Sequence, residues 1–188
     1  MTLQEIFDSL GQAFGEKLQH RTEFRGETTY ALAASDLREI AKFCRDEISF
    51  DYLLDITSID NFGEEPRFEI VYHLYSITQK HGPVIIRMRT ADRAAEARLP
   101  SLTPIWRSAE FQEREIFDLY GIRFDGHPDM RRILMWDEFK DYPMRKDYRE
   151  PDDYEYEPTP HDDVLEKAKQ HYAPRPQFDG AENITAQK

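Results

Sequence analysis

The sequence has 188 residues, with 25 Lys and Arg against 37 Asp and Glu, and therefore a formal net charge of −12. A chain of this length is expected to form one domain with room for a tail. The acidic balance argues against nucleic acid as a partner, because phosphate binding requires clustered Lys and Arg. No apolar run approaches the ~18 residues that a membrane span needs, and the N-terminus lacks the basic and apolar parts of a signal peptide. We therefore expect a protein that is neither secreted nor membrane-spanning.

The sequence contains a single cysteine, Cys44. A disulfide within the chain is excluded, as is an iron-sulfur cluster or cysteine-type zinc site built from this chain alone, because each requires several thiolates. Cys44 lies at helical spacing from Leu37, Ile40 and Ala41. This spacing predicts a buried core thiol rather than a nucleophile.

Common motifs for nucleotide binding and hydrolysis are absent: the sequence has no G-x-G-x-x-G, G-x-x-x-x-G-K-[ST], H-E-x-x-H or G-x-S-x-G. The six histidines show no spacing typical of metal ligands. His161, followed by two aspartates, could bind a divalent ion, but the start of a helix is the preferred interpretation. We expect no metal in this chain. A metal-dependent enzyme that uses His127, His161 and the acidic tail is the alternative.

The first part of the chain carries helix and strand signals in turn. Thr2 and Glu5 have the spacing of a capping box, and apolar residues at helical spacing predict an amphipathic helix over 2–18. After a polar break, residues 27–32 are β-prone, and Ser35 can cap a second helix. This part is thus predicted to run helix, strand, helix.

Three strands are predicted next. Residues 50–59 are rich in β-branched and aromatic residues, 61–66 form a turn, and side chains alternate over 68–75. A second turn at 81–83 leads to a third alternating strand at 84–89. This alternation is typical of an antiparallel sheet with one covered face.

Two further helices are predicted after the strands. One covers 91–99 and is stopped by Pro100, and the other covers 109–120 and ends at Gly121, a suitable residue for a helix C-terminus. We therefore interpret residues 1–122 as an α+β domain, with a small, mostly antiparallel or mixed sheet and helices packed on one face.

The composition changes beyond this domain. Residues 123–150 mix charges and aromatic residues without periodicity, which predicts an irregular interface segment held by specific contacts. Residues 151–188 contain five of the 11 prolines and nine acidic against four basic residues. Such a composition buries too little apolar surface to order itself. We expect an extended acidic, proline-rich tail that is mobile in the isolated chain and ordered in an assembly.

Charged and aromatic residues are densest over 111–148. On a helix, Glu113 and Tyr120 share one face, whereas Arg114 and Asp118 are i,i+4 partners in the weaker orientation, worth only about 0.3 kcal/mol. A solvated helix followed by a loop is one interpretation. The other is a permanent interface, in which paired charges set the register and aromatic side chains supply buried area.

This block contains four short motifs in a fixed order around His127. They are Glu113-Arg114-Glu115, Asp118-Leu119-Tyr120, Arg131-Arg132-Ile133-Leu134 and Pro143-Met144-Arg145-Lys146-Asp147-Tyr148. Together they closely resemble the signature of the 30 kDa subunit family of respiratory complex I, which in bacteria is the C subunit of NADH:quinone oxidoreductase. Met144 stands where the family pattern has leucine, a volume-conserving difference.

The resemblance implies a scaffold subunit in the peripheral arm of a proton-translocating enzyme. It implies that the chain is not catalytic alone and holds no cofactor, because iron-sulfur clusters, FMN, NADH and quinone are bound by other subunits. The implied partners are the D (49 kDa) subunit of the quinone site and the neighbouring B and I iron-sulfur subunits. The implied location is the cytoplasmic face of the cell inner membrane, with membrane contact only through the complex. An equivalent subunit of a membrane-bound nickel-iron hydrogenase is the alternative.

The resemblance also suggests roles for single residues. Five cations are assigned to internal or interfacial ion pairs, namely Arg114, Arg131, Arg132, Arg145 and Lys146. Four carboxylates are candidate acceptors, namely Glu113, Glu115, Asp118 and Asp147. Gly121 ends the helix and His127 fixes a turn, with a proton-relay role left open. Four aromatic residues are expected anchors, namely Tyr120, Phe124, Trp136 and Tyr148.

The motif leaves open which ion pairs lie within the chain and which cross to a partner. If a pair is buried across the interface, Arg131→Ala or Arg132→Ala is expected to weaken assembly by roughly 2–5 kcal/mol, because the partner charge is stranded.

Overall fold

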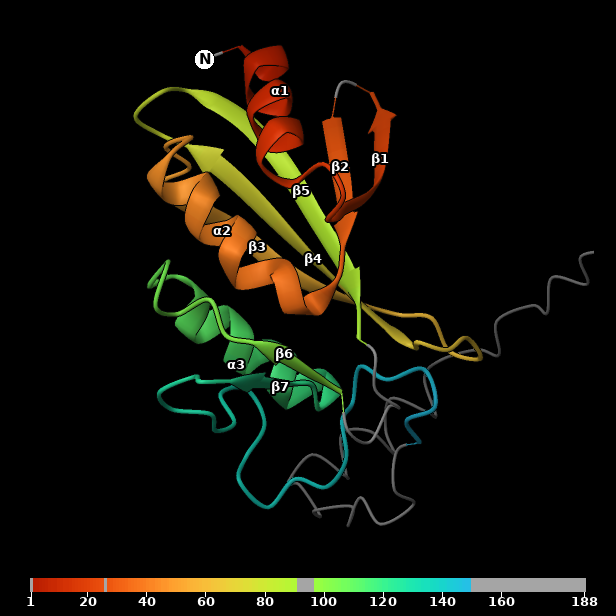
Figure 1. Ribbon diagram of the computed structural model, residues 1–188. Helices are drawn as coiled ribbons and strands as arrows, with labels where there is room; N and C mark the ends of the chain where they lie inside the picture. Colours follow the sequence, from red (N-terminus) through yellow and green to blue (C-terminus); the bar gives the residue numbers. More distant parts are fainter. Residues whose placement is uncertain (1, 26, 91–96, 150–188) are drawn as a thin grey trace, which may run out of the picture. The chain divides into compact units, whose positions relative to one another are not determined.

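A computed structural model gives the architecture of the chain (Figure 1) and describes residues 2–25, 27–90 and 97–149. These residues belong to one compact unit, 1–149. The predicted tail at 151–188, which includes His161, lies outside the described residues, so its expected mobility stays a prediction.

Helix α1 spans Leu3–Phe14 and begins with the predicted capping box. The Thr2 hydroxyl accepts a hydrogen bond from the Glu5 backbone N–H at 3.3 Å, and the Glu5 carboxylate accepts one from the Thr2 N–H at 2.8 Å. The helix ends earlier than the prediction of residue 18. Strand β1 (Leu18–Phe24) follows and pairs antiparallel with β2 (Glu27–Leu32). We missed β1 because its sequence lacks alternation, and its pairing with β2 decides its conformation.

The main sheet has five strands in the order β1-β2-β5-β4-β3. Strands β3 (Tyr52–Asp60), β4 (Phe68–Ser76) and β5 (His81–Arg89) form the predicted antiparallel meander. Strand β2 joins β5 in parallel, so the sheet is mixed. The predicted turn at 81–83 is wrong, because these residues already belong to β5.

Helix α2 (Leu37–Asp46) buries the predicted stripe of Leu37, Ile40, Ala41 and Cys44. Ser35 is not its cap; it lies in the short 3-10 helix η1 (Ala34–Asp36) that precedes α2. Figure 1 shows α1 and α2 over one face of the sheet. Alternate side chains of the strands fill the core beneath them. The predicted α+β class, a small sheet with helices on one face, is confirmed.

The Cys44 side chain is fully buried in this core, and burial raises the pKa of its thiol to about 12. We therefore expect no reaction with an aromatic disulfide reagent at pH 8 in the native chain, and one thiol per chain in denaturant, because the thiolate is the reactive form. The measurement is the absorbance of the released thiol. Rapid stoichiometric reaction of the native chain would contradict the buried position.

A second, two-stranded sheet lies beside helix α3 (Ala109–Tyr120). Strand β6 (Arg98–Pro100) pairs in parallel with β7 (Arg123–Asp125). The prediction of a helix over 91–99 is wrong at its C-terminal end, and residues 91–96 lie outside the described residues. At residues 98–100, pairing with β7 outweighs the local preference for a helix, because β7 supplies hydrogen-bond partners from far along the chain.

Among the described residues, no helix has the length and apolarity needed to cross a membrane.

Candidate partner interface

Helix α3 ends as predicted at Gly121, which has a φ of 77°. A side chain at this position would also be blocked sterically. A Cβ would lie 2.5 Å from Cε2 of Tyr142 and 2.6 Å from Nη2 of Arg145. Glycine therefore allows Tyr142 and Arg145 to pack against the end of α3.

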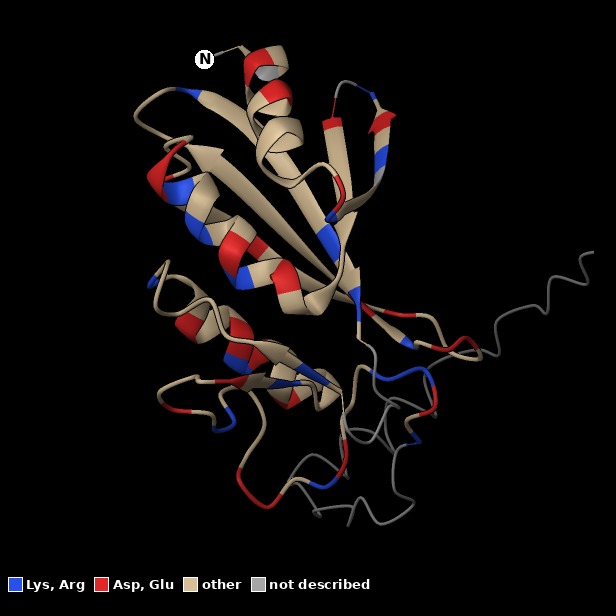
Figure 2. Ribbon diagram, in the orientation of Figure 1, with Lys and Arg blue, Asp and Glu red and all other residues tan. Residues whose placement is uncertain are grey.

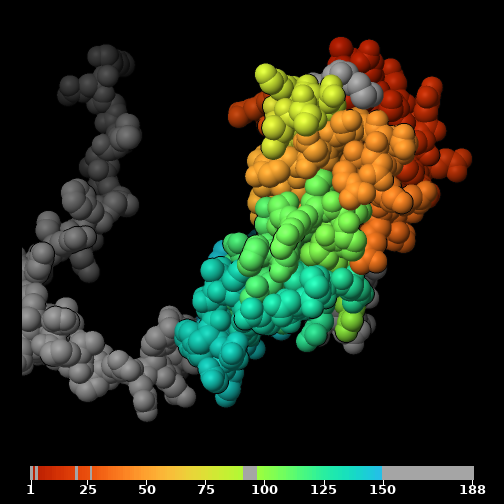
Figure 3. All heavy atoms as spheres, turned by 90° about the vertical axis from the view of Figure 1, so that its left-hand side faces the viewer, coloured from red at the N-terminus to blue at the C-terminus, as the bar shows by residue number. Residues whose placement is uncertain are grey.

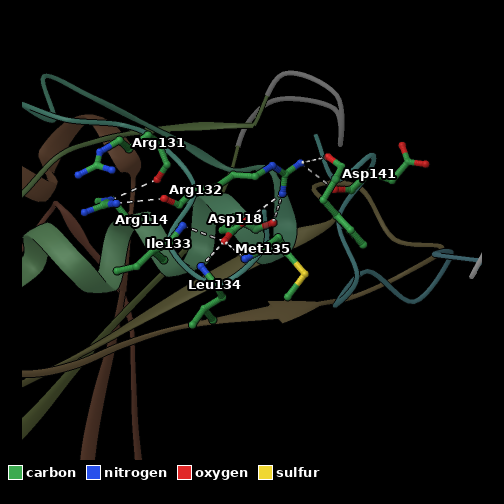
Figure 4. Close-up of polar contacts among 9 residues, drawn as sticks. Arg114, Asp118, Arg131, Arg132, Ile133, Leu134, Met135 and Asp141 are labelled. Carbon is green, nitrogen blue, oxygen red and sulfur yellow. Dashed lines mark hydrogen bonds and ion pairs between the residues drawn. The ribbon is translucent and has the colours of Figure 1, made fainter. Parts of the chain in front are cut away.

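One turn before this end, the buried Asp118 carboxylate organises the chain that follows (Figure 4). Its Oδ1 accepts a hydrogen bond from Nη1 of Arg132 at 2.6 Å. Its Oδ2 accepts three backbone N–H groups, from Ile133 at 3.0 Å, Leu134 at 2.7 Å and Met135 at 2.8 Å. We call Asp118, Arg132 and residues 133–135 the Asp118 cluster.

Burial would raise the pKa of Asp118, but the three N–H groups and the guanidinium together outweigh it and hold the pKa below its usual value. The carboxylate is therefore charged at neutral pH and satisfied on both oxygens.

Arg132 closes the loop that follows the cluster. Its Nη1 also donates to the Asp118 carbonyl, and its Nη2 donates to the carbonyls of Phe139 at 3.0 Å and Asp141 at 3.1 Å. The guanidinium lies 5.4 Å from the ring centre of Tyr142. One side chain thus joins both ends of residues 133–141 to α3.

Arg114 lies on α3 one turn before Asp118, but the two side chains are not paired with each other despite their i,i+4 spacing. Arg114 is buried and donates instead to the backbone carbonyls of Arg131 at 3.2 Å and Arg132 at 3.0 Å. It therefore supports the same loop from the N-terminal side.

A second anchor fixes the end of the segment to the β3–β4 hairpin. Arg67 forms a bidentate pair with the buried Asp60 at 2.7 Å and also donates to both oxygens of Asp147, at 2.6 and 2.9 Å. The Lys146 backbone N–H donates to Asp60 at 2.8 Å. Asp60 and Arg67 could not be identified from the sequence, because no local spacing connects Arg67 with Asp147, 80 positions later.

Several other predicted residues are held within the chain. Arg145 donates to the Tyr120 carbonyl at 2.6 Å and lies 4.4 Å from the ring centre of Tyr142. Tyr120 packs edge-on against Phe68, with ring centres 6.4 Å apart. Tyr148 lies 6.1 Å from the ring of Phe139. The Arg145 contact joins the segment to the end of α3, Tyr120 joins that end of α3 to β4, and the Tyr148 contact lies within the segment.

His127 joins the start of residues 123–149 to helix α3. Its Nδ1 accepts the Asp129 N–H at 3.0 Å, so we assign the proton to Nε2, which lies 2.9 Å from the Glu110 carbonyl. Both ring nitrogens thus contact backbone groups, which fits the predicted turn. The proton-relay role stays untested.

Glu113 faces the core, where its carboxyl group is fully buried. It accepts hydrogen bonds from the Ser101 hydroxyl at 2.6 Å and the Leu102 N–H at 2.7 Å. Burial raises its pKa to about 7, against the lowering effect of these two donors and of the positive charge of Arg38. The structure thus places Glu113 as a link between α3 and the turn after β6 rather than in the predicted ion pair.

Four predicted residues differ in exposure from the role expected of them: three charged side chains are exposed and one aromatic side chain is buried. The Arg131 side chain is 68% exposed and pairs with Asp129 at the surface, unlike Arg132. Glu115 and the side chain of Lys146 are also exposed. Phe124, a predicted anchor, is buried in the core instead.

Large apolar side chains of residues 123–149 are exposed. Exposed fractions range from 37% to 57% for four of them, namely Ile133, Leu134, Trp136 and Met144. We call these four residues the apolar surface. Figure 3 shows residues 123–149, in teal to blue, gathered at one end of the compact unit. Figure 2 shows positive and negative residues interleaved along α3 and this segment.

A metal site is not formed by the part of the chain that the structure describes, where no three His, Cys, Asp or Glu side chains are grouped for a metal ion. The alternative that combines His127 with His161 is not decided by this finding, since His161 lies outside the described residues.

The fold and the segment define a class: an α+β domain that folds a charged, irregular segment onto itself through buried ion pairs. Residues 30–154 match the model of the family described as respiratory-chain NADH dehydrogenase, 30 Kd subunit. The chain belongs to this family, and the resemblance of its motifs is confirmed.

Individual relatives agree with this family, and each is the C subunit of an NADH-quinone oxidoreductase. The chain is 40% identical over 139 residues to the C subunit of Citrifermentans bemidjiense, covering 74% of this chain and 84% of the relative. Identity to the C 2 subunit of Rhizobium meliloti is also 40% over 139 residues, covering 72% of this chain and 74% of the relative. The C subunit of Geobacter sulfurreducens is 37% identical over 140 residues, covering 74% of this chain and 85% of the relative.

Solved structures share the fold. A trypsin-resistant fragment of Nqo5, residues 1–134, superposes with a TM-score of 0.54 at 30% identity, covering 69% of this chain and 99% of the fragment. A chain of a membrane-bound sulfane sulfur reductase, an archaeal respiratory membrane complex, superposes with a TM-score of 0.67 at 22% identity, covering 96% of this chain and 98% of that chain. The second likeness concerns the fold alone.

Proposed function

We propose that the chain is a non-catalytic scaffold subunit of proton-translocating NADH:quinone oxidoreductase. In this role residues 123–149 pack against the D (49 kDa) subunit, near the B and I iron-sulfur subunits, at the cytoplasmic face of the inner membrane. The observation that carries the proposal is the apolar surface, which is held by buried ion pairs of the same chain. Membership of the family of respiratory-chain NADH dehydrogenase subunits supports the proposal, because a subunit of an assembly has partners that can cover such a surface.

In this function the chain positions other subunits and carries out no chemical step itself. FMN, the iron-sulfur clusters, NADH and quinone are held by other subunits, and this chain keeps the electron carriers and the quinone site in register. A rigid, preorganised segment suits this task, because a partner then binds without first ordering a flexible loop.

The test is gentle detergent extraction of membranes that contain the full-length tagged chain, followed by mass spectrometry and an assay of NADH oxidation with a quinone. We expect the D, B and I subunits to co-purify in an active complex. A nickel-iron large subunit as the neighbour would favour the hydrogenase alternative. A chain that emerges alone from the cytosol, with a stoichiometric metal ion, would instead favour the metal-dependent enzyme.

A further inference from the structure

The buried charged residues of the signature have few free hydrogen-bonding groups to offer another protein. Both oxygens of Asp118 are occupied, and Arg132 uses four of its five N–H groups on oxygens of this chain. Arg67 and Asp60 satisfy each other in bidentate geometry. The buried ion pairs are therefore complete before any partner arrives.

The same hydrogen bonds prepare the loop of residues 133–141 for burial against a partner protein. An irregular loop pressed against a partner would normally bury unpaired backbone groups, which is unfavourable. Here the N–H groups of residues 133–135 and the carbonyls of Phe139 and Asp141 already have partners in the Asp118 cluster. A partner can thus displace water from this loop without stranding those groups.

We infer that the buried charged residues of the signature are positioning residues within the chain, and that the apolar surface they hold contacts an apolar face of a different, neighbouring protein subunit. This inference rests on the proposed function and adds the chemistry of the contact. Tryptophan and methionine are enriched in the cores of protein interfaces, where charged residues are depleted.

Two exposed acidic residues, Asp137 and Glu138, directly follow Trp136 and indicate the kind of partner. A symmetric contact between two copies of the chain, with Trp136 at its two-fold axis, would bring these like charges together. Insertion among anionic lipid headgroups would be opposed by the same charges. The occupant that fits is therefore a second kind of protein rather than a copy or a lipid surface.

The experiment uses the full-length tagged chain in its complex, immobilised from detergent extracts and washed at low and high salt. High salt screens exposed ion pairs but leaves apolar contacts intact. We expect retention of the neighbouring subunits by the wild type to change less than about twofold between the two washes. The double variant Leu134→Ser with Trp136→Ser should reduce retention about tenfold or more in both washes.

Matched variants distinguish ionic contacts with the neighbouring subunit from apolar contacts. Arg131→Ala and Lys146→Ala remove exposed charges of the signature and should change retention less than about twofold. Phe24→Ser and Ile77→Ser remove exposed apolar side chains outside the segment and should do the same. The thermal midpoint of each isolated variant shows whether the chain is still folded, and a double variant that has lost its fold is replaced by Leu134→Gln alone.

Each contrary result has a distinct meaning. Salt release of the wild type, matched by loss in Arg131→Ala or Lys146→Ala, would overturn the apolar contact but leave the proposed function standing. Retention of only a second copy of the chain, or binding to anionic vesicles that the double variant abolishes, would overturn the assigned partner. If the wild type retains no respiratory subunit at all, the proposed function fails, and the inference fails with it.

Discussion

Replacing Asp118 by asparagine is expected to lower the free energy of unfolding of the isolated chain by about 3–5 kcal/mol, the range for breaking a buried ion pair. The amide has one oxygen where the carboxylate has two, so it cannot accept both the Arg132 guanidinium and the three backbone N–H groups. In either orientation, its NH2 group faces donors. Loss of this anchor should also open residues 133–141 to proteolysis.

Urea unfolding followed by circular dichroism measures the stability, and limited proteolysis with mass spectrometry locates the opened loop. Asp129→Asn is the matched control, because the Asp129–Arg131 pair lies at the surface and should leave the unfolding midpoint unchanged. Equal midpoints and equal cleavage patterns for Asp118→Asn and the wild type would refute the structural role of the cluster.

The effect of Asp118→Asn should also depend on pH. Hydrogen bonds hold the folded-state pKa of Asp118 below the unfolded value of about 3.9, so its stabilisation is complete above that value and is lost as the pH falls through the folded-state pKa. The difference between wild type and variant should accordingly shrink in acid.

Glu113→Gln is expected to act in the opposite direction and to stabilise the chain at high pH. The fold raises the pKa of Glu113 from its usual value of 4.5 to about 7, mainly by burial. The folded state therefore binds more protons than the unfolded state between these values. Its contribution to stability is complete below about pH 4.5 and is lost as the pH rises through 7.

For a shift of this size, the lost contribution is about 3 kcal/mol. The amide cannot titrate, yet it can accept the Leu102 N–H and donate to the Ser101 hydroxyl, which then donates to Thr103, 2.8 Å away. The variant should come closest to the wild type at pH 5 and exceed its stability at pH 8.

Urea unfolding of both proteins between pH 5 and 8 checks this expectation. Glu115→Gln is the control, since Glu115 lies on the exposed side of α3 and should leave the pH profile unchanged. The positive charge of Arg38 acts on Glu113 and lowers its pKa. The negative charge of Glu113 in turn helps to raise the pKa of the buried Tyr72 hydroxyl. Parallel pH profiles for Glu113→Gln and the wild type would show that Glu113 does not titrate in this range.

Several parts of this protein depend only on neighbours within a few residues, and these parts could be predicted from the sequence. The stripe of α2 and the alternation of β3–β5 record burial at a fixed period, whereas the capping box of Thr2 and Glu5 records a local hydrogen-bond spacing. Each of these predictions is confirmed. The order and spacing of the motifs between residues 113 and 148 likewise sufficed for the family.

Elements whose partners lie far along the chain could not be predicted in this way, because three-dimensional packing sets their conformation. Strand β1 and the replacement of a predicted helix end by β6 both depend on pairing that no local period records. The same holds for the charges of the segment. Sequence spacing offered Arg114 as the partner of Asp118, whereas the fold brings Arg132 to it. A buried carboxylate takes the donors that surround it in space, and these are set by packing rather than by position in the sequence.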